Sequence, residues 1–292
     1  MDRAHGYSAL VRAFRLGLTV RGLRPHTVQT YVRDAERFIT SVGTRTPGSI
    51  TANDVREYFI TYQDGRSPKT VRECQLALRS FFRFLVQEGE MRKDPTRDMK
   101  LAKYRVEPQP TYSESEVKRL LMVCDGKSLE GVRDRAMVMV LFDTGVRESE
   151  LLSMTMPDFD KRRSRVSGKT GTRDVPLGMA TLQAVEKYIR RAGITAAPVW
   201  RGKRGPLTRS GVLQAVSRLC QRAGVPQKGV HAFRRAAAAQ MKRLGMQDSD
   251  ILEVCGWKDV TMLRRYISEV AGELAANAHR RYSPGDALGG VR

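Results

Sequence analysis

Three separated segments of the sequence place basic side chains next to groups that can bind anions or move protons. The first segment, TGVRESEL, holds Arg147 in a short joint, because Gly145 would end one helix and Ser149 would begin the next. A guanidinium held in such a joint can make two-pronged contacts with phosphate oxygens. Glu150 lies about one helical turn away and could orient it. For this segment alone, a buried Arg–Glu pair with a structural role is the alternative.

The second segment, HAFRR, begins at His231 and is followed by a run of alanines. His231 and Arg234 lie three residues apart, so they would share one face of a helix that the alanines allow to pack closely. A helix start with polar caps would give the same pattern. The third segment, GWKD, places Trp257 nine residues before Tyr266 in a basic neighbourhood. Alone, Trp257 is typical of a core residue and Tyr266 is one of nine tyrosines.

Two other chemistries find little support in the sequence. Gly168-Lys169-Thr170 resembles the end of a phosphate-binding P-loop, but the first glycine of that motif would fall on Arg163. The four cysteines form no CxxC pair, and the four histidines form no HExxH or similar group. We therefore expect no metal, no cofactor and no disulfide, with the cysteines buried in a protein of a reducing compartment.

The charge balance indicates a polyanionic partner. Lys and Arg number 52 against 31 acidic residues, for a net charge of +21, and the excess is spread over both 1–110 and 111–292. A long polyanion touching both parts explains this distribution, and counterion release would drive its binding. A cationic solubilising surface or a membrane-surface protein is the alternative. The longest apolar run is far below the ~20 residues that span a bilayer, so we expect a cytoplasmic protein without a membrane partner.

The first hundred residues predict a helical domain. Apolar side chains recur at helical spacing from Thr27, from the capping signal at Thr51 and Asp54, and from Ser67 to about Gly89. Basic side chains lie off these apolar stripes and are candidate contacts to DNA phosphates, although a solvated helix face would look the same. These candidates are Arg56, Lys69, Arg72, Arg79 and Arg83.

The rest of the chain predicts a mixed α/β domain at 111–292, joined to a helical domain at 1–105 by a linker at 106–110. A helix should open at Thr111 to Ser113, a buried helix should cover 131–143, and a β-hairpin with Lys169 in its bend should cover 164–177. Further helices are expected at about 180–192, 209–223, 231–244, 247–255 and 270–281. The last is amphipathic, and we expect it to pack on a neighbouring protomer or, failing that, on its own chain.

The order, spacing and residue types of these segments resemble one family, the tyrosine recombinases or phage integrases. TGVRESELLSM resembles their first arginine box, VSGKTGTRDVPL their hairpin with its lysine, HAFRRAAAAQM their HxxR box, and CGWKDVTMLRRY the closing segment that ends in the nucleophile. The helical part is similar to their core-binding domain in LRPHTVQTYVRDAERF and SPKTVRECQLALRSFFRFLVQEG. The resemblance runs from about residue 7 to 275. It implies a SAM-like helical bundle followed by a mixed α+β catalytic domain.

The resemblance also implies a role for each motif residue. Arg147 and Arg234 would clamp the scissile phosphate, and Lys169 would protonate the leaving 5′ oxygen. His231 would assist proton transfer at the nucleophile, Tyr266.

Two positions depart from the commoner family pattern. Trp257 stands at the sixth position of the family's set of active-site residues, where many members have histidine. A tryptophan can still donate one N–H hydrogen bond. Arg235 stands where a histidine is commoner, and we expect it to add positive charge that contacts DNA without changing the mechanism.

The function that the resemblance implies is site-specific DNA recombination through a 3′-phosphotyrosyl intermediate, without metal or ATP. The expected partner is double-stranded DNA with core-type sites, bound by dimers and by a synaptic tetramer in the bacterial cytoplasm, at the nucleoid. Integration or excision of a phage or mobile element is the main hypothesis, and Xer-type resolution of chromosome dimers is the alternative within the family. A metal-dependent transposase or nuclease, and a DNA-binding regulator without catalysis, are the alternatives from other classes. Because the chain begins near the helical domain, no arm-site domain is expected.

Overall fold

The computed structural model describes the chain except for residues 1–2, 44, 105–108, 169–170, 268–270 and 290–292 and the side chains of 3–6 and 265. The chain divides into two compact units, Met1–Val106 and Glu107–Arg292. We call them the helical unit and the mixed unit. The predicted fold class, an all-α domain followed by a mixed α+β domain, is confirmed. Positions 106–108 of the expected linker lie outside the described residues.

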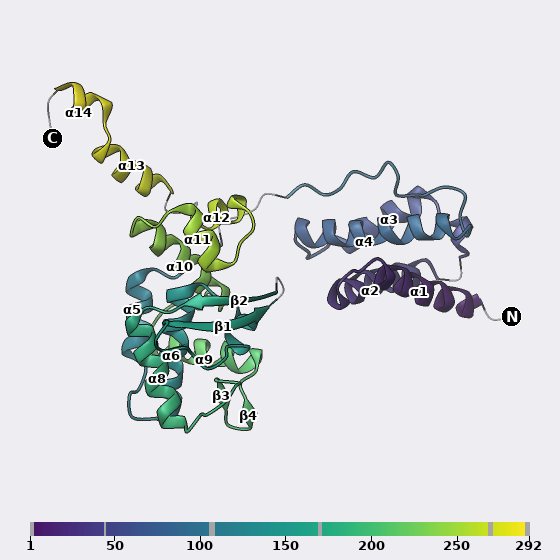
Figure 1. The fold of residues 1–292 in the computed structure, drawn as a ribbon. Helices are drawn as coiled ribbons and strands as arrows, with labels where there is room; N and C mark the ends of the chain where they lie inside the picture. The colour runs from purple at the N-terminus through teal and green to yellow at the C-terminus, as the bar shows by residue number, and fades with distance from the viewer. Residues whose placement is uncertain (1–2, 44, 105–108, 169–170, 268–270, 290–292) are drawn as a thin grey trace. The chain divides into compact units, whose positions relative to one another are not determined.

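In its described residues the helical unit contains four α-helices and one 3₁₀ turn; Figure 1 labels the four α-helices. These elements are α1 (Arg3–Val20), α2 (Pro25–Val42), η1 (Pro47–Ser49), α3 (Ala52–Tyr62) and α4 (Pro68–Gln87). Proline opens α2 and α4, where its fixed φ suits the first helical turn. Thr51 and Asp54 form the predicted capping box of α3, and Ser67 accepts a hydrogen bond from the backbone of Thr70 at the start of α4.

Phenylalanines form the centre of the helical unit. Phe38 of α2 meets Phe82 of α4 edge-on with ring centroids 5.3 Å apart, and Phe14 of α1 meets Phe81 at 5.1 Å. All four rings are almost fully buried. Burial of such a side chain contributes about 1.5–3 kcal/mol. The apolar stripes predicted from the sequence are therefore the packing faces of these helices.

The mixed unit contains ten helices and two short hairpins in its described part (Figure 1). The first elements are α5 (Glu114–Met122), α6 (Leu129–Thr144), α7 (Glu148–Leu152), β1 (Arg163–Gly168), β2 (Gly171–Pro176), α8 (Met179–Ala192), β3 (Arg201–Gly202) and β4 (Gly205–Pro206). Those that follow are α9 (Arg209–Ala223), α10 (His231–Arg243), α11 (Asp248–Cys255), α12 (Val260–Ile267), α13 (Ala271–Arg281) and α14 (Pro284–Gly289).

Two separate clusters of buried side chains hold the mixed unit together. In the larger one, α6 lies against α8 and α10, and Val166 and Val175 of the β1–β2 hairpin join the same core. The smaller one contains Trp257 and Leu263 and joins α10, α11 and α12. All four cysteines are buried thiols. No helix in the described part of the chain is long and apolar enough to cross a membrane.

The predicted hairpin and most predicted helices are confirmed, but α1, η1, the β3–β4 hairpin, α12 and α14 were not individually predicted. The short β3–β4 hairpin has two residues in each strand, too few for an alternating pattern to be visible. The helices α12 and α14 also have no predicted counterpart. The amphipathic segment expected at about 270–281 is a helix, α13, and it buries no residue.

Candidate active site

The joint between α6 and α7 places Arg147. Gly145 ends α6 in the left-handed conformation, with φ of 60°. A Cβ there would lie 3.1 Å from the Sγ of Cys255 and 3.3 Å from the Cβ of Ala237, so glycine also permits close approach of α10 and α11. Arg147 is the residue before α7. Its backbone N–H donates to Oε2 of Glu150 at 2.8 Å, and its Nη1 donates to Oε1 at 2.7 Å.

Glu150 is the anionic centre of an arginine cluster. Its side chain is 1% exposed and accepts a hydrogen bond from Nη2 of Arg173 at 3.2 Å, while Nη1 of Arg234 lies 4.0 Å away. Burial alone would raise the pKa of this carboxyl, but the Arg147 backbone N–H and the charges of Arg173 and Arg147 outweigh it and leave the pKa below its usual value. One carboxylate among several guanidinium groups leaves an excess of positive charge that favours an anion.

Arg234 is buried on α10, with 1% exposure. Its Nη1 donates to the carbonyl of Gly145 at 2.5 Å and its Nη2 to the carbonyl of Cys255 at 2.6 Å. Its guanidinium also lies 4.6 Å from the centre of the Trp257 ring, within cation–π range. Burial lowers the pKa of Arg234 to about 10, so it stays a cation at neutral pH. This side chain thus ties the α6–α7 joint to the end of α11.

Tyr266 lies on α12 between two aromatic partners. Its ring stacks on Trp257 with centroids 5.0 Å apart and an interplanar angle of 19°. Its hydroxyl oxygen lies 3.0 Å from Nε2 of His231. His231 is exposed, yet desolvation by the surrounding protein and the charges of Arg235, Arg234 and Arg147 lower its pKa to about 4. A neutral imidazole at this distance can accept the phenolic proton.

Lys169 lies outside the described residues. The glycine before it is described, and a Cβ on Gly168 would stand 2.7 Å from Cγ of Glu150. The end of β1 therefore reaches the arginine cluster at Gly168. The structure thus brings together Arg147, Glu150, His231, Arg234, Trp257 and Tyr266.

Arg173 is a member of this cluster that sequence reasoning missed. It lies on β2 opposite Val166 in the hairpin register. Its own motif, VSGKTGTRDVPL, contains a second basic residue after Lys169 on the strand leaving the bend, and this was the signal that could have identified it.

Three of the predicted DNA-contacting arginines donate hydrogen bonds to backbone carbonyls of the protein. Arg235 is buried, and both its Nε and its Nη2 donate to the carbonyl of Pro110, which joins α10 to the segment before α5. Arg79 and Arg72 of α4 donate to the carbonyls of Met99 and Ala102. Contact of these side chains with DNA stays a prediction.

The three remaining candidates in the helical unit are exposed. Arg56 of α3 donates to the side chain of Asn53 at 2.6 Å. Lys69 of α4 lies 3.9 Å from Glu73. Arg83 of α4 is exposed on the same helix. Their contact with DNA also stays a prediction.

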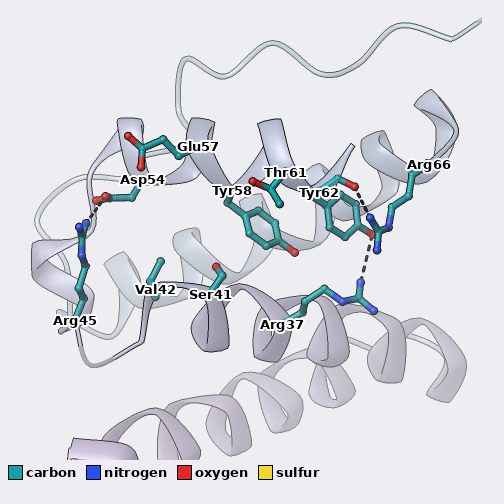
Figure 2. Close-up of a pocket in the computed structure, with 10 residues that line it drawn as sticks. All are labelled: Arg37, Ser41, Val42, Arg45, Asp54, Glu57, Tyr58, Thr61, Tyr62 and Arg66. Carbon is teal, nitrogen blue, oxygen red and sulfur yellow. Dashed lines mark hydrogen bonds and ion pairs between the residues drawn. The ribbon is translucent and has the colours of Figure 1, made fainter. Parts of the chain in front are cut away.

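A groove of about 520 Å³ between α2 and α3 gathers further basic side chains that the sequence did not single out. Figure 2 shows the side chains of Arg37 and Arg66 extending toward Tyr62. The guanidinium of Arg66 lies 4.4 Å from the centre of the Tyr62 ring, and Nη1 of Arg37 lies 3.4 Å from its hydroxyl. Arg45 pairs with Asp54 at the other end of the groove. The spacing of Tyr62 and Arg66, four residues apart, was the available signal.

Comparison with known proteins identifies the family. Residues 111–272 match the model of the "Phage integrase family". The chain belongs to this family. Residues 10–89 match the model "Phage integrase, N-terminal SAM-like domain", so both predicted domain types are confirmed for the integrase.

Relatives of the integrase are tyrosine recombinases. It is 27% identical over 263 residues to the tyrosine recombinase XerD of Listeria monocytogenes serovar 1/2a, a match that covers 84% of this chain and 89% of the relative. It is 29% identical over 270 residues to the tyrosine recombinase XerC of Pelobacter propionicus, covering 88% and 89%. A structure of a lambda integrase dimer bound to a COC′ core site has a similar fold, with a TM-score of 0.76, 18% identity and coverage of 89% and 76%.

The predicted enzyme class, a tyrosine site-specific recombinase, is confirmed. Phosphoryl transfer builds negative charge on the non-bridging oxygens, and fixed arginines can stabilise that charge. The described residues contain no group of three or more His, Cys, Asp and Glu side chains that could hold a metal ion.

Proposed function

We propose that the integrase cuts and rejoins double-stranded DNA at core-type sites, with Tyr266 forming a covalent bond to the 3′ phosphate. The observation that carries this proposal is the 3.0 Å distance between the Tyr266 hydroxyl and Nε2 of His231. A phenol with a pKa near 10 is only about 0.1% ionised at pH 7, so it needs a nearby proton acceptor to attack phosphorus. His231 supplies one from the same helix that carries Arg234.

In the proposed reaction, the Tyr266 oxygen attacks phosphorus while its proton passes to His231. The bond from phosphorus to the 5′ oxygen breaks, and Lys169 gives a proton to that oxygen. Arg147 and Arg234 hold the non-bridging oxygens. Reversal of these steps by the 5′ hydroxyl of another strand rejoins the DNA, and since the phosphodiester energy stays in the protein–DNA bond, no ATP is consumed.

Trp257 would add a hydrogen bond to the phosphate. Its Nε1 is buried and has no partner among the described residues, and a buried N–H without an acceptor is costly in a protein that does not use it. The ring stacks on Tyr266 and contacts Arg234, so its N–H lies near the proposed nucleophile and near one of the proposed phosphate-binding arginines.

We further propose that two protomers bind each core site and four form the synapse, in the bacterial cytoplasm at the nucleoid. Solved integrase structures of similar fold include a dimer on a core site and a lambda integrase tetramer on a Holliday junction. The helix α13 buries no residue in the isolated chain, which supports its docking on a neighbouring protomer. The chain boundaries that we propose for the domains are 1–105 and 111–292.

Integration or excision of a phage or mobile element is the proposed biological role, and the Xer role is the second candidate. Trp257 at a position where histidine is common favours the first. The match to XerD and XerC relatives over most of their length favours the second. Sequencing DNA that is covalently trapped on the protein in its host separates them. Junctions at the ends of an inserted element support the first role, and a single chromosomal site without such an element supports the second.

The activity itself is tested by covalent capture. The protein is incubated with a library of nicked duplexes in EDTA and separated on a denaturing gel, and peptide mapping locates the DNA. We expect an adduct at Tyr266 with a free 5′ hydroxyl on the released strand, and none with Tyr266→Phe. An adduct on Tyr282, or activity that EDTA abolishes, would contradict the proposal; a regulator without catalysis would give no adduct with either protein.

A further inference from the structure

Arg173 connects three parts of the active site that are distant in sequence. It lies on β2 of the hairpin that carries Lys169, and its side chain is only 17% exposed. Its Nη1 donates to the carbonyl of Val254 in α11 at 2.7 Å, and its Nη2 donates to Oε2 of Glu150 in α7 at 3.2 Å. One guanidinium therefore spans the hairpin, the arginine joint and the helix that leads to Trp257.

Two glycines let this arrangement close tightly. Gly256, in the left-handed conformation with φ of 63°, would place a Cβ 2.6 Å from Nε and 3.0 Å from Cδ of Arg173. Real Cβ atoms essentially never come so near, so the guanidinium of Arg173 lies directly over this turn. The carbonyl of Gly256 in turn faces Nη2 of Arg147 at 3.5 Å. On the other side, Gly168 leaves room for the side chain of Glu150.

The contacts of Arg173 differ from those of an ordinary surface ion pair. Its partner Glu150 is 1% exposed and binds the backbone and side chain of Arg147. Removing Arg173 would leave that carboxylate with one fewer hydrogen bond and the Val254 carbonyl without this donor. Both changes would loosen groups that must hold a phosphate and a phenol in line, where an error of about 1 Å can reduce the rate roughly 10²-fold.

We propose that Arg173 is a positioning residue for strand cleavage: it holds Glu150, and through it Arg147, in register with the Cys255–Gly256–Trp257 turn that precedes the Tyr266 helix. This inference rests on the proposed function. In this role Arg173 acts through Glu150 and the turn. The hairpin thereby shares one fixed frame with both the phosphate clamp and the nucleophile.

The test is single-turnover cleavage of the captured nicked duplex by full-length Arg173→Ala, with rate constant, amplitude and half-saturating DNA concentration measured separately. We expect the rate constant at saturating DNA to fall roughly 10- to 100-fold, with half-saturation and amplitude retained. A residue with only a structural role would lower the amplitude, which reports the folded fraction, and leave the rate constant unchanged. That result, or a wild-type rate, overturns the inference.

Matched variants complete the design. Arg165→Ala removes an arginine from the other strand of the same hairpin, where it is exposed and pairs with Asp174, and should leave the rate constant unchanged. Glu150→Gln should slow cleavage, and adding Arg173→Ala to it should cost much less than it does alone, since both act through one contact. Full additivity overturns the inference.

Two further arms keep the result interpretable. If Arg173→Ala does not fold, Arg173→Lys decides: a single ammonium cannot reproduce both contacts of the guanidinium, so a rate reduced roughly 10-fold supports the inference and a wild-type rate overturns it. If the wild-type protein forms no adduct, or Tyr266→Phe forms one, the proposed function fails. If the Tyr266 adduct forms normally and Arg173 variants are unaffected, this inference alone fails.

Discussion

The imidazole Nε2 of His231 and the phenolic oxygen of Tyr266 lie 3.0 Å apart, although 35 residues separate them in the chain. The contact joins the first residue of α10 to α12, and these helices also pack against each other. The proposed nucleophile therefore lies beside its proposed proton acceptor in the DNA-free chain. Packing of α10 against α12 within one protomer holds the two side chains together.

Replacing His231 by alanine should slow formation of the covalent adduct by about 10²- to 10⁴-fold, the usual contribution of a positioned general base. DNA affinity should change little, since Arg147 and Arg234 remain. Single-turnover cleavage and a gel-shift titration at fixed salt measure the two quantities. Equal losses in cleavage rate and in DNA affinity would indicate that His231 binds DNA and does not move a proton.

The titration of His231 provides a second prediction. Desolvation and the neighbouring arginines should place its pKa at about 4 in the DNA-free protein. In the unfolded chain the pKa of His231 is near 6.5. Between about pH 6.5 and 4 this imidazole is therefore protonated in the unfolded chain and neutral in the folded one, so the fold becomes less stable as the pH falls through this range. NMR titration against a His231→Gln reference tests the value, since the chain has only four histidines. A pKa near 6.5 would contradict the predicted environment.

Two replacements of Trp257 should separate the contribution of its Nε1–H to cleavage from the contribution of its packed ring to stability. Trp257→Phe keeps a ring against Tyr266 but has no Nε1–H. Cleavage should fall roughly 10- to 150-fold, which corresponds to the about 1.5–3 kcal/mol of a hydrogen bond to a charged group, with little change in Tm. Trp257→Ala also removes the packed ring and should destabilise the fold by about 3–5 kcal/mol. Wild-type cleavage by Trp257→Phe would show that its N–H does not reach the phosphate.

The alanines of α10 should tolerate no enlargement. Ala238 is fully buried in the small cluster with Trp257 and Leu263, so Ala238→Leu should destabilise the protein by about 1–3 kcal/mol. Urea unfolding measures the loss. The exposed position Ser210, near the start of α9, offers a control for side-chain enlargement. A neutral Ala238→Leu variant would mean that α12 is packed more loosely than these contacts indicate.

The sequence predicted best those features that local rules determine. The capping box of Thr51 and Asp54, the helix that begins after Ser67 and the β1–β2 hairpin all depend on residues that are close together in the chain. The described residues that the family motifs singled out lie close together, because the order of these motifs along the chain is a strong constraint. The tight joint expected around Arg147 is present, with Glu150 as its partner.

The sequence predicted least where long-range packing decides. Arg173 looks like any strand residue until the end of α11 is folded against it. The contact between the guanidinium of Arg235 and the carbonyl of Pro110, 125 residues away, was also not visible in the sequence. The helix α12 is short, and its apolar positions face α10 and α11, so its local pattern alone did not identify it.

The division of the mixed unit into a large and a small buried cluster has a consequence for local stability. Tyr266 belongs to the helix held by the small cluster, whereas the β1–β2 hairpin and α6 belong to the large one. Cooperative units with fewer buried side chains open at a lower free energy than the whole fold. We therefore expect α12, which carries Tyr266, to open locally at a lower free energy than the β1–β2 hairpin and α6, which stay folded in the larger cluster.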